Sequence, residues 1–92
     1  MRFEPLLKED CVGEYQVFVY TLEKAITQAM VERLSGLGTL QVFHDFPKPY
    51  FRLQSNHMLL KGVIQTPRLD VTFYDAALEE KSKLENILAQ IP

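Results

Sequence analysis

The chain has 92 residues, of which 47% are hydrophobic, so it can bury one small core but not two. Ten lysine and arginine residues against twelve aspartate and glutamate residues give a formal net charge of −2 at pH 7. This near-neutral balance excludes a strongly basic nucleic-acid binder and a highly charged disordered tail. We therefore expect a single domain over residues 1–92.

The sequence also predicts where the protein works. No apolar run approaches the roughly 18 residues needed to cross a bilayer. Residues 1–5 include a glutamate and a proline where a signal peptide would be apolar. Cys11 is the single cysteine and cannot form an internal disulfide, which is typical of a reducing compartment. We expect a soluble, cytoplasmic protein that does not act at a membrane.

The first half of the chain predicts a strand followed by a helix. Residues 14–20 carry β-branched and aromatic side chains on both alternating faces, as a central strand does. Thr21 is then expected to cap a helix that runs to about Ser35, because apolar residues recur at three- and four-residue steps. Gly36 is suited to end this helix. Residues 1–7 fit either an edge strand or an irregular arm.

The second half predicts an antiparallel meander and a final helix. Short turn signals separate four strand-like segments, residues 39–46, 50–54, 58–65 and 69–74. The last helix is expected from about residue 76 to residue 90, with Asp75 as its N-cap. Acidic residues precede basic ones along it, which is the order that the helix dipole favours.

This order of elements, β-α-β-β-β-β-α, predicts an α+β fold. The simplest packing is a two-layer sandwich, with both helices on one face of an antiparallel sheet. The opening strand–helix–strand–strand order partly resembles the ferredoxin-like family of folds, over about half of the chain. Residues 58–65 depart from that family, because they predict a strand where its second crossover helix would be. A shared fold would not establish a function.

Few residues suggest catalysis or metal binding. His44, His57 and Cys11 are the usual nitrogen and sulfur ligands, and their spacing is too wide for a local metal clip. Acidic neighbours should raise the pKa of Cys11, which disfavours a nucleophilic role. We expect no catalytic residue, no metal site and no cofactor, and we regard an enzyme as the less favoured reading.

His44 and Asp45 form the most suggestive pair of polar residues. Adjacent residues of a strand point to opposite faces, so the two side chains cannot form a simple imidazole–carboxylate relay. We interpret His44 as a residue near the end of the sheet that hydrogen-bonds locally. The alternative is a proton-transfer or ligand-contacting residue tuned by apolar surroundings.

Strand alternation divides the sheet into a face under the helices and an opposite, open face. In this assignment Val17 and Val19 lie under the helices, and the open face mixes aromatic residues with glutamine, threonine and an arginine. Such a composition is typical of a recognition surface. The alternative is that large residues brace a twisted sheet or lie beneath the N-terminal arm. The expected partner-binding residues are Phe18, Tyr20, Phe43, Tyr50, Arg52 and Tyr74.

The leading hypothesis is a small non-enzymatic binding or regulatory module. It would self-associate as a homo-oligomer or dock a protein partner through the aromatic-rich face. A single-stranded nucleic-acid-binding domain is the first alternative, because residues 47–74 contain four cations and one aspartate, a local charge of +3. Four cations over three strands are nevertheless a thin electrostatic footprint. The second alternative is a small-molecule sensor, with its ligand between two copies or under residues 47–49.

Overall fold

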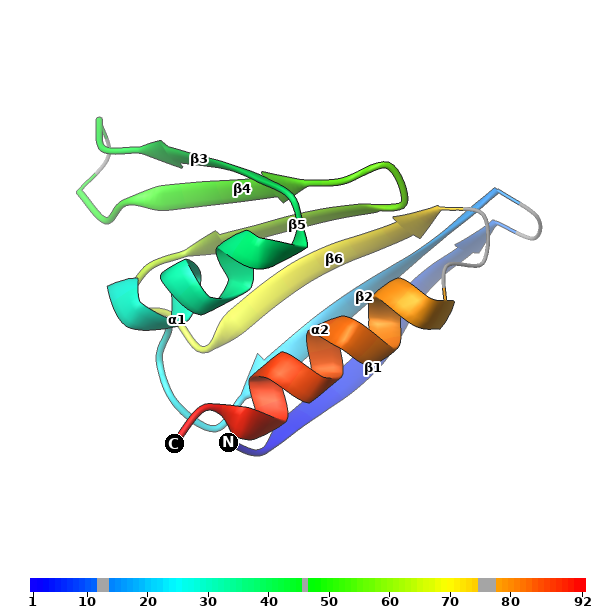
Figure 1. Cartoon of the computed structure of the whole chain (residues 1–92), viewed down its shortest axis with the longest axis horizontal. Coiled ribbons are helices and arrows are strands. Elements are labelled where there is room, and N and C mark those ends of the chain that lie inside the picture. The colour runs from blue at the N-terminus through cyan, green and yellow to red at the C-terminus, as the bar shows by residue number, and fades with distance from the viewer. Residues whose placement is uncertain (12–13, 46, 75–77) are drawn as a thin grey trace.

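The computed structural model describes residues 1–11, 14–45, 47–74 and 78–92, which form one α+β fold (Figure 1). The described strands are β1 (Phe3–Cys11), β2 (Tyr15–Leu22), β3 (Thr39–Phe43), β4 (Tyr50–Gln54), β5 (Met58–Val63) and β6 (Arg68–Tyr74). The described helices are α1 (Gln28–Leu34), the 3₁₀ turn η1 (Ser35–Leu37) and α2 (Leu78–Gln90). The expectation of an α+β fold with an antiparallel sheet and two helices is confirmed.

The six described strands form one sheet in the order β1-β2-β6-β5-β4-β3. Every neighbouring pair in this order is antiparallel. The segment that contains α1 carries the chain from β2 to the far edge of the sheet, where β3 begins. Figure 1 shows α1 and α2 on the same side of the sheet. The opposite side is the open face.

One hydrophobic core fills the space between the sheet and the helices. Alternation along the strands supplies it, and β6 is the clearest case, since Leu69, Val71 and Phe73 are buried while the residues between them are not. The helices contribute buried leucines from one side only, as amphipathic helices do. The largest fully buried side chains are Tyr20, Phe51, Ile26, Leu34, Leu53, Met58, Leu60, Leu69, Leu84, Leu88, Val31 and Val71.

The N-terminal part of the chain contains one more strand than the predicted order. Residues 1–7, which fitted either a strand or an arm, belong mostly to β1, and β1 pairs with β2 as an antiparallel hairpin. The pairing register shifts between Leu7 and Glu9, which is the mark of a β-bulge. β1 therefore forms one edge of the sheet and does not cover the open face.

The prediction that the first helix follows Thr21 is wrong. Thr21 and Leu22 continue β2, and α1 begins only at Gln28, where the Thr27 hydroxyl accepts a hydrogen bond from the Met30 amide at 3.2 Å. The intervening backbone hydrogen-bonds elsewhere. The Leu22 amide donates to Pro67 at 2.8 Å. The Ile26 amide donates to Thr66 at 2.9 Å. These bonds hold the segment against the turn between β5 and β6 in a non-helical conformation.

The remaining element boundaries differ only at their ends. β4 has the predicted bounds, β3 ends at Phe43, β5 ends at Val63, and β6 begins at Arg68. Gln65 has a φ of 76°, in the left-handed region, so the chain turns there and cannot continue as a strand. The expected N-cap, Asp75, lies outside the described residues.

Candidate binding surface on the open face

Cross-strand pairing defines which side chains share the open face. Phe43 of β3 lies opposite Tyr50 of β4, and Tyr50 lies opposite Val63 of β5. In the neighbouring row, Arg52 lies opposite Lys61. Residues directly opposite in an antiparallel pair point to the same face of the sheet. An apolar row and a basic row therefore run side by side across β4 and β5.

Two of the predicted surface residues, Phe18 and Tyr20, lie on the other face. Tyr20 pairs with Leu69 and is fully buried beneath the helices. Its hydroxyl donates a hydrogen bond to Glu85 Oε2 of α2 at 2.9 Å. Burial and this hydrogen bond, in that order, raise the pKa of Tyr20 well above its ordinary value. Tyr20 is unavailable to a partner on the open face.

Phe18 is half-buried on the helix side. Its ring meets Phe73 edge-on at a centroid distance of 5.9 Å. The ammonium group of Lys81 in α2 lies 5.2 Å from the Phe18 ring centre, within the range of a cation–π contact. Side chains alternate between the two faces along β2. Because Phe18 and Tyr20 lie under the helices, Val17 and Val19 point to the open face, opposite Thr72 and Asp70. The predicted faces of β2 are thus inverted.

The other four predicted residues do lie on the open face. Phe43, Tyr50 and Arg52 stand close together on β3 and β4. Tyr74 lies apart from them on β6, opposite Tyr15 of β2. The structure thus brings three of the residues into one site and leaves Tyr74 outside it. Their role in binding a partner stays a prediction.

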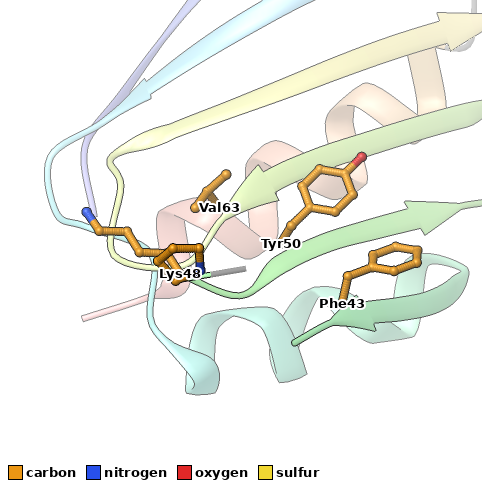
Figure 2. Close-up of a pocket in the computed structure, with 5 residues that line it drawn as sticks. Phe43, Lys48, Tyr50 and Val63 are labelled. Carbon is orange, nitrogen blue, oxygen red and sulfur yellow. The ribbon is translucent and has the colours of Figure 1, made fainter. Parts of the chain in front are cut away.

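An apolar hollow opens at one end of β3, β4 and β5 (Figure 2). Its volume is about 680 Å³. The Phe43 and Tyr50 rings stand 5.4 Å apart between centres with an interplanar angle of 33°. Phe43 is 38% exposed, an unusually large fraction for a phenylalanine. The hollow is lined by Phe43, Pro47, Lys48, Tyr50 and Val63.

Pro47, Lys48 and Val63 were not predicted as site residues. Pro47 and Lys48 precede β4 and line the hollow together with Tyr50, the first residue of that strand. The small-molecule alternative placed a ligand under residues 47–49. Apart from the Lys48 ammonium group and the Tyr50 hydroxyl, the lining can offer a partner mainly van der Waals contact, so the hollow suits an apolar side chain.

A strip of three cations, Arg52, Lys61 and Arg68, borders the hollow. Arg52 and Lys61 lie directly opposite each other, and Lys61 also lies opposite Asp70. Asp70 already forms an ion pair with Arg68 at 3.0 Å. Arg52 donates one hydrogen bond to Gln54 at 3.2 Å, while its Nε is buried and has no hydrogen-bond partner among the described residues. The strip contains more positive charge than its acidic residue can balance.

The described residues whose side chains suggested catalysis or metal binding do not come together in one site. His44 is exposed just beyond the end of β3, as is Asp45. Cys11 Sγ lies 3.2 Å from a carboxylate oxygen of Glu14, and this hydrogen bond, with the nearby acids Asp10 and Glu9, raises the pKa of the thiol as predicted. The described residues hold no group of three His, Cys, Asp or Glu side chains able to share a metal ion.

Comparisons of the chain with protein-family models, with curated proteins and with solved structures give no match. The partial likeness to the ferredoxin-like family therefore stays a resemblance in the order of elements. Within the described residues, no helix combines the length and apolar character needed to cross a membrane.

Proposed function

We propose that the protein is a non-enzymatic binding module that docks an acidic protein segment on its open face. The observation that carries the proposal is the position of the apolar hollow beside the cation strip. The hollow would receive an apolar side chain of the partner, and Arg52 and Lys61, which lie together along one side of the hollow, would pair with an acidic residue next to that side chain. A binding site that combines an apolar anchor with flanking charges is typical of peptide recognition.

Charge distribution supports an acidic partner. Residues 47–74 contain Lys48, Arg52, Lys61 and Arg68 against Asp70, a formal charge of +3, while the rest of the chain carries −5. Like charges directly opposite in a sheet are unfavourable. A carboxylate placed between Arg52 and Lys61 would relieve their repulsion and could accept a hydrogen bond from the arginine.

This proposal predicts selective binding of an acidic peptide. The probe is a synthetic peptide in which a central Phe-Leu pair is flanked by Glu-Asp on each side, titrated into ¹⁵N-labelled protein. We expect amide shift changes around Phe43, Tyr50 and Val63. Replacing Tyr50 by alanine should weaken binding by at least about tenfold, as loss of a central aromatic anchor does.

The matched control is Tyr74→Ala, which removes a half-buried tyrosine from the same face but outside the hollow. It should leave peptide affinity within about twofold of wild type, as near-neutral surface substitutions do. A second peptide, with Lys-Lys flanking the same Phe-Leu pair, should bind much more weakly. Equal binding of both peptides, or shift changes centred away from the hollow, would refute the proposal.

A single-stranded nucleic-acid-binding role is the second candidate. The Phe43–Tyr50 ring pair beside three cations favours it, because bases can stack on aromatic residues while basic groups contact the phosphates. Its mark would be binding of a mixed-sequence oligonucleotide that weakens steeply as salt is added. No binding at low salt would remove this candidate. The acidic net charge of the whole chain makes it the less favoured of the two.

A further inference from the structure

The two edges of the sheet differ in how well they can pair with another strand. β1 contains Pro5, which has no amide hydrogen, and its register shifts between Leu7 and Glu9. A run of charged residues, Lys8, Glu9 and Asp10, follows. Prolines, bulges and charges are the devices that keep edge strands from pairing with other chains. β1 is therefore a protected edge, even though Leu6 and Leu7 are exposed.

β3 has none of these devices. Its five residues, Thr39–Phe43, include no charge and no proline, and they pair with β4 without a register shift. Figure 1 shows β3 at the edge of the sheet, and among the described elements no helix or strand lies beyond it. An edge strand presents every second amide and carbonyl group outward. β3 is therefore open to further pairing.

The apolar side chains along β3 are incompletely covered on both faces. Leu40 and Val42 pack against the core from the helix side, yet both are only partly buried. Phe43 is exposed on the open face. Another strand alongside β3 would cover these side chains while its backbone pairs with the outward amide and carbonyl groups.

We propose that the strand is the β3 of a second copy, paired antiparallel about a two-fold axis through Gln41. Only this register overlaps all five residues. It sets Gln41 against the Gln41 of the other copy, Leu40 against Val42, and Thr39 against Phe43. Because the strand is uncharged, the symmetric pairing brings no like charges together. The two outer edges of the dimer are then protected β1 strands, so association closes at two copies.

The dimer would contain one continuous antiparallel sheet. Both open faces would lie on the same side, with one apolar hollow near each end of the paired β3 strands. A five-residue edge contact is small beside the roughly 1,200 Å² buried in stable interfaces. We therefore expect a weak dimer whose population rises with protein concentration. The proposal uses the sheet edge and does not depend on peptide docking in the hollow.

Sedimentation equilibrium from micromolar to millimolar protein concentration tests the dimer. The expected mass rises from the 10.7 kDa of the monomer toward twice that value. Gln41→Lys should raise the dissociation constant by about fivefold, because it places like charges opposite each other at the axis. Gln41→Glu should weaken self-association in the same way. An equimolar mixture of the two variants should restore association.

The matched control is Gln54→Lys. Gln54, like Gln41, is exposed on the open face and neighbours Arg52, but it lies on β4, away from the edge. This variant should dimerise as wild type does, and its circular dichroism should match that of both Gln41 variants. A wild-type protein that stays monomeric at millimolar concentration would overturn the proposal. A dimer that Gln41→Lys leaves intact would also overturn the proposal. If Leu7→Lys abolished that dimer, the contact between the copies would lie at β1.

Discussion

Truncation of Phe51 to alanine should lower the free energy of unfolding by about 3–5 kcal/mol. Phe51 lies on β4 and its side chain is fully buried under the helices. Its ring lies over Gly62 of β5, where an added Cβ would come within 2.8 Å of the Phe51 ring carbons. Gly62 has no side chain that could move into the space left by the ring. The resulting cavity would persist, which places the cost toward the upper end of the range.

The matched comparison is Phe43→Ala, because Phe43 belongs to the adjacent strand but faces outward. Its loss should cost less than about 1 kcal/mol, since part of the ring is already in contact with solvent. Urea unfolding followed by circular dichroism measures both variants. A domain of this length has a stability of about 5–14 kcal/mol, so this cost is a large fraction of the total and the Phe51 variant should unfold at a much lower urea concentration than wild type. Similar costs for the two variants would contradict the assignment of the sheet faces.

Strand β2 shows why one predicted face was inverted. Val17, Phe18, Val19 and Tyr20 are all apolar or aromatic, so either alternation fits a buried face and the segment alone cannot fix its phase. The deciding residue is Leu22, which is buried and shares a face with Tyr20. The predicted helix included Thr21 and Leu22, so Leu22 could not be used to decide which face of the strand is buried. β4 to β6 have clear alternation, and their predicted faces are correct.

The start of α1 shows a different limit of sequence reasoning. The apolar spacing through Leu22, Ile26 and Met30 suits a helix, and all three side chains are indeed buried. What prevents a helix before Gln28 is tertiary: backbone groups at Leu22 and Ile26 bond to the turn between β5 and β6. Burial was therefore predictable from spacing, but the local conformation depended on a partner about forty residues away in sequence.

Part of the hollow was predictable from the sequence and part was not. Strand alternation predicted that Phe43 and Tyr50 share the open face, but their direct pairing depends on where β3 ends, at Phe43, and this the sequence did not predict. Pro47 and Lys48 were not predictable, since no periodicity describes a loop. The cation strip became visible only when the register set Arg52 against Lys61. Composition showed an excess of positive charge in this region, and pairing showed where it is concentrated.

Replacement of Tyr20 by phenylalanine should lower the free energy of unfolding by about 1.5–3 kcal/mol at neutral pH. The Tyr20 hydroxyl and the Lys81 ammonium group both bond to Glu85 Oε2, so this carboxylate links β2 to α2. Phenylalanine keeps the ring and its packing but leaves Glu85 without one of its two donors. Tyr74→Phe, on the open face, is the matched control and should cost less than about 0.5 kcal/mol.

The same tyrosine predicts how stability depends on alkaline pH. Burial and the bond to Glu85 raise the pKa of Tyr20 in the folded state above its unfolded value of about 10. The unfolded chain therefore loses this proton first as pH rises. The stability linked to Tyr20 is fully present below about pH 10 and is lost progressively above it. Urea unfolding at several pH values should show a steeper alkaline decline for wild type than for Tyr20→Phe. Parallel declines would mean that Tyr20 titrates normally and is not held beneath α2.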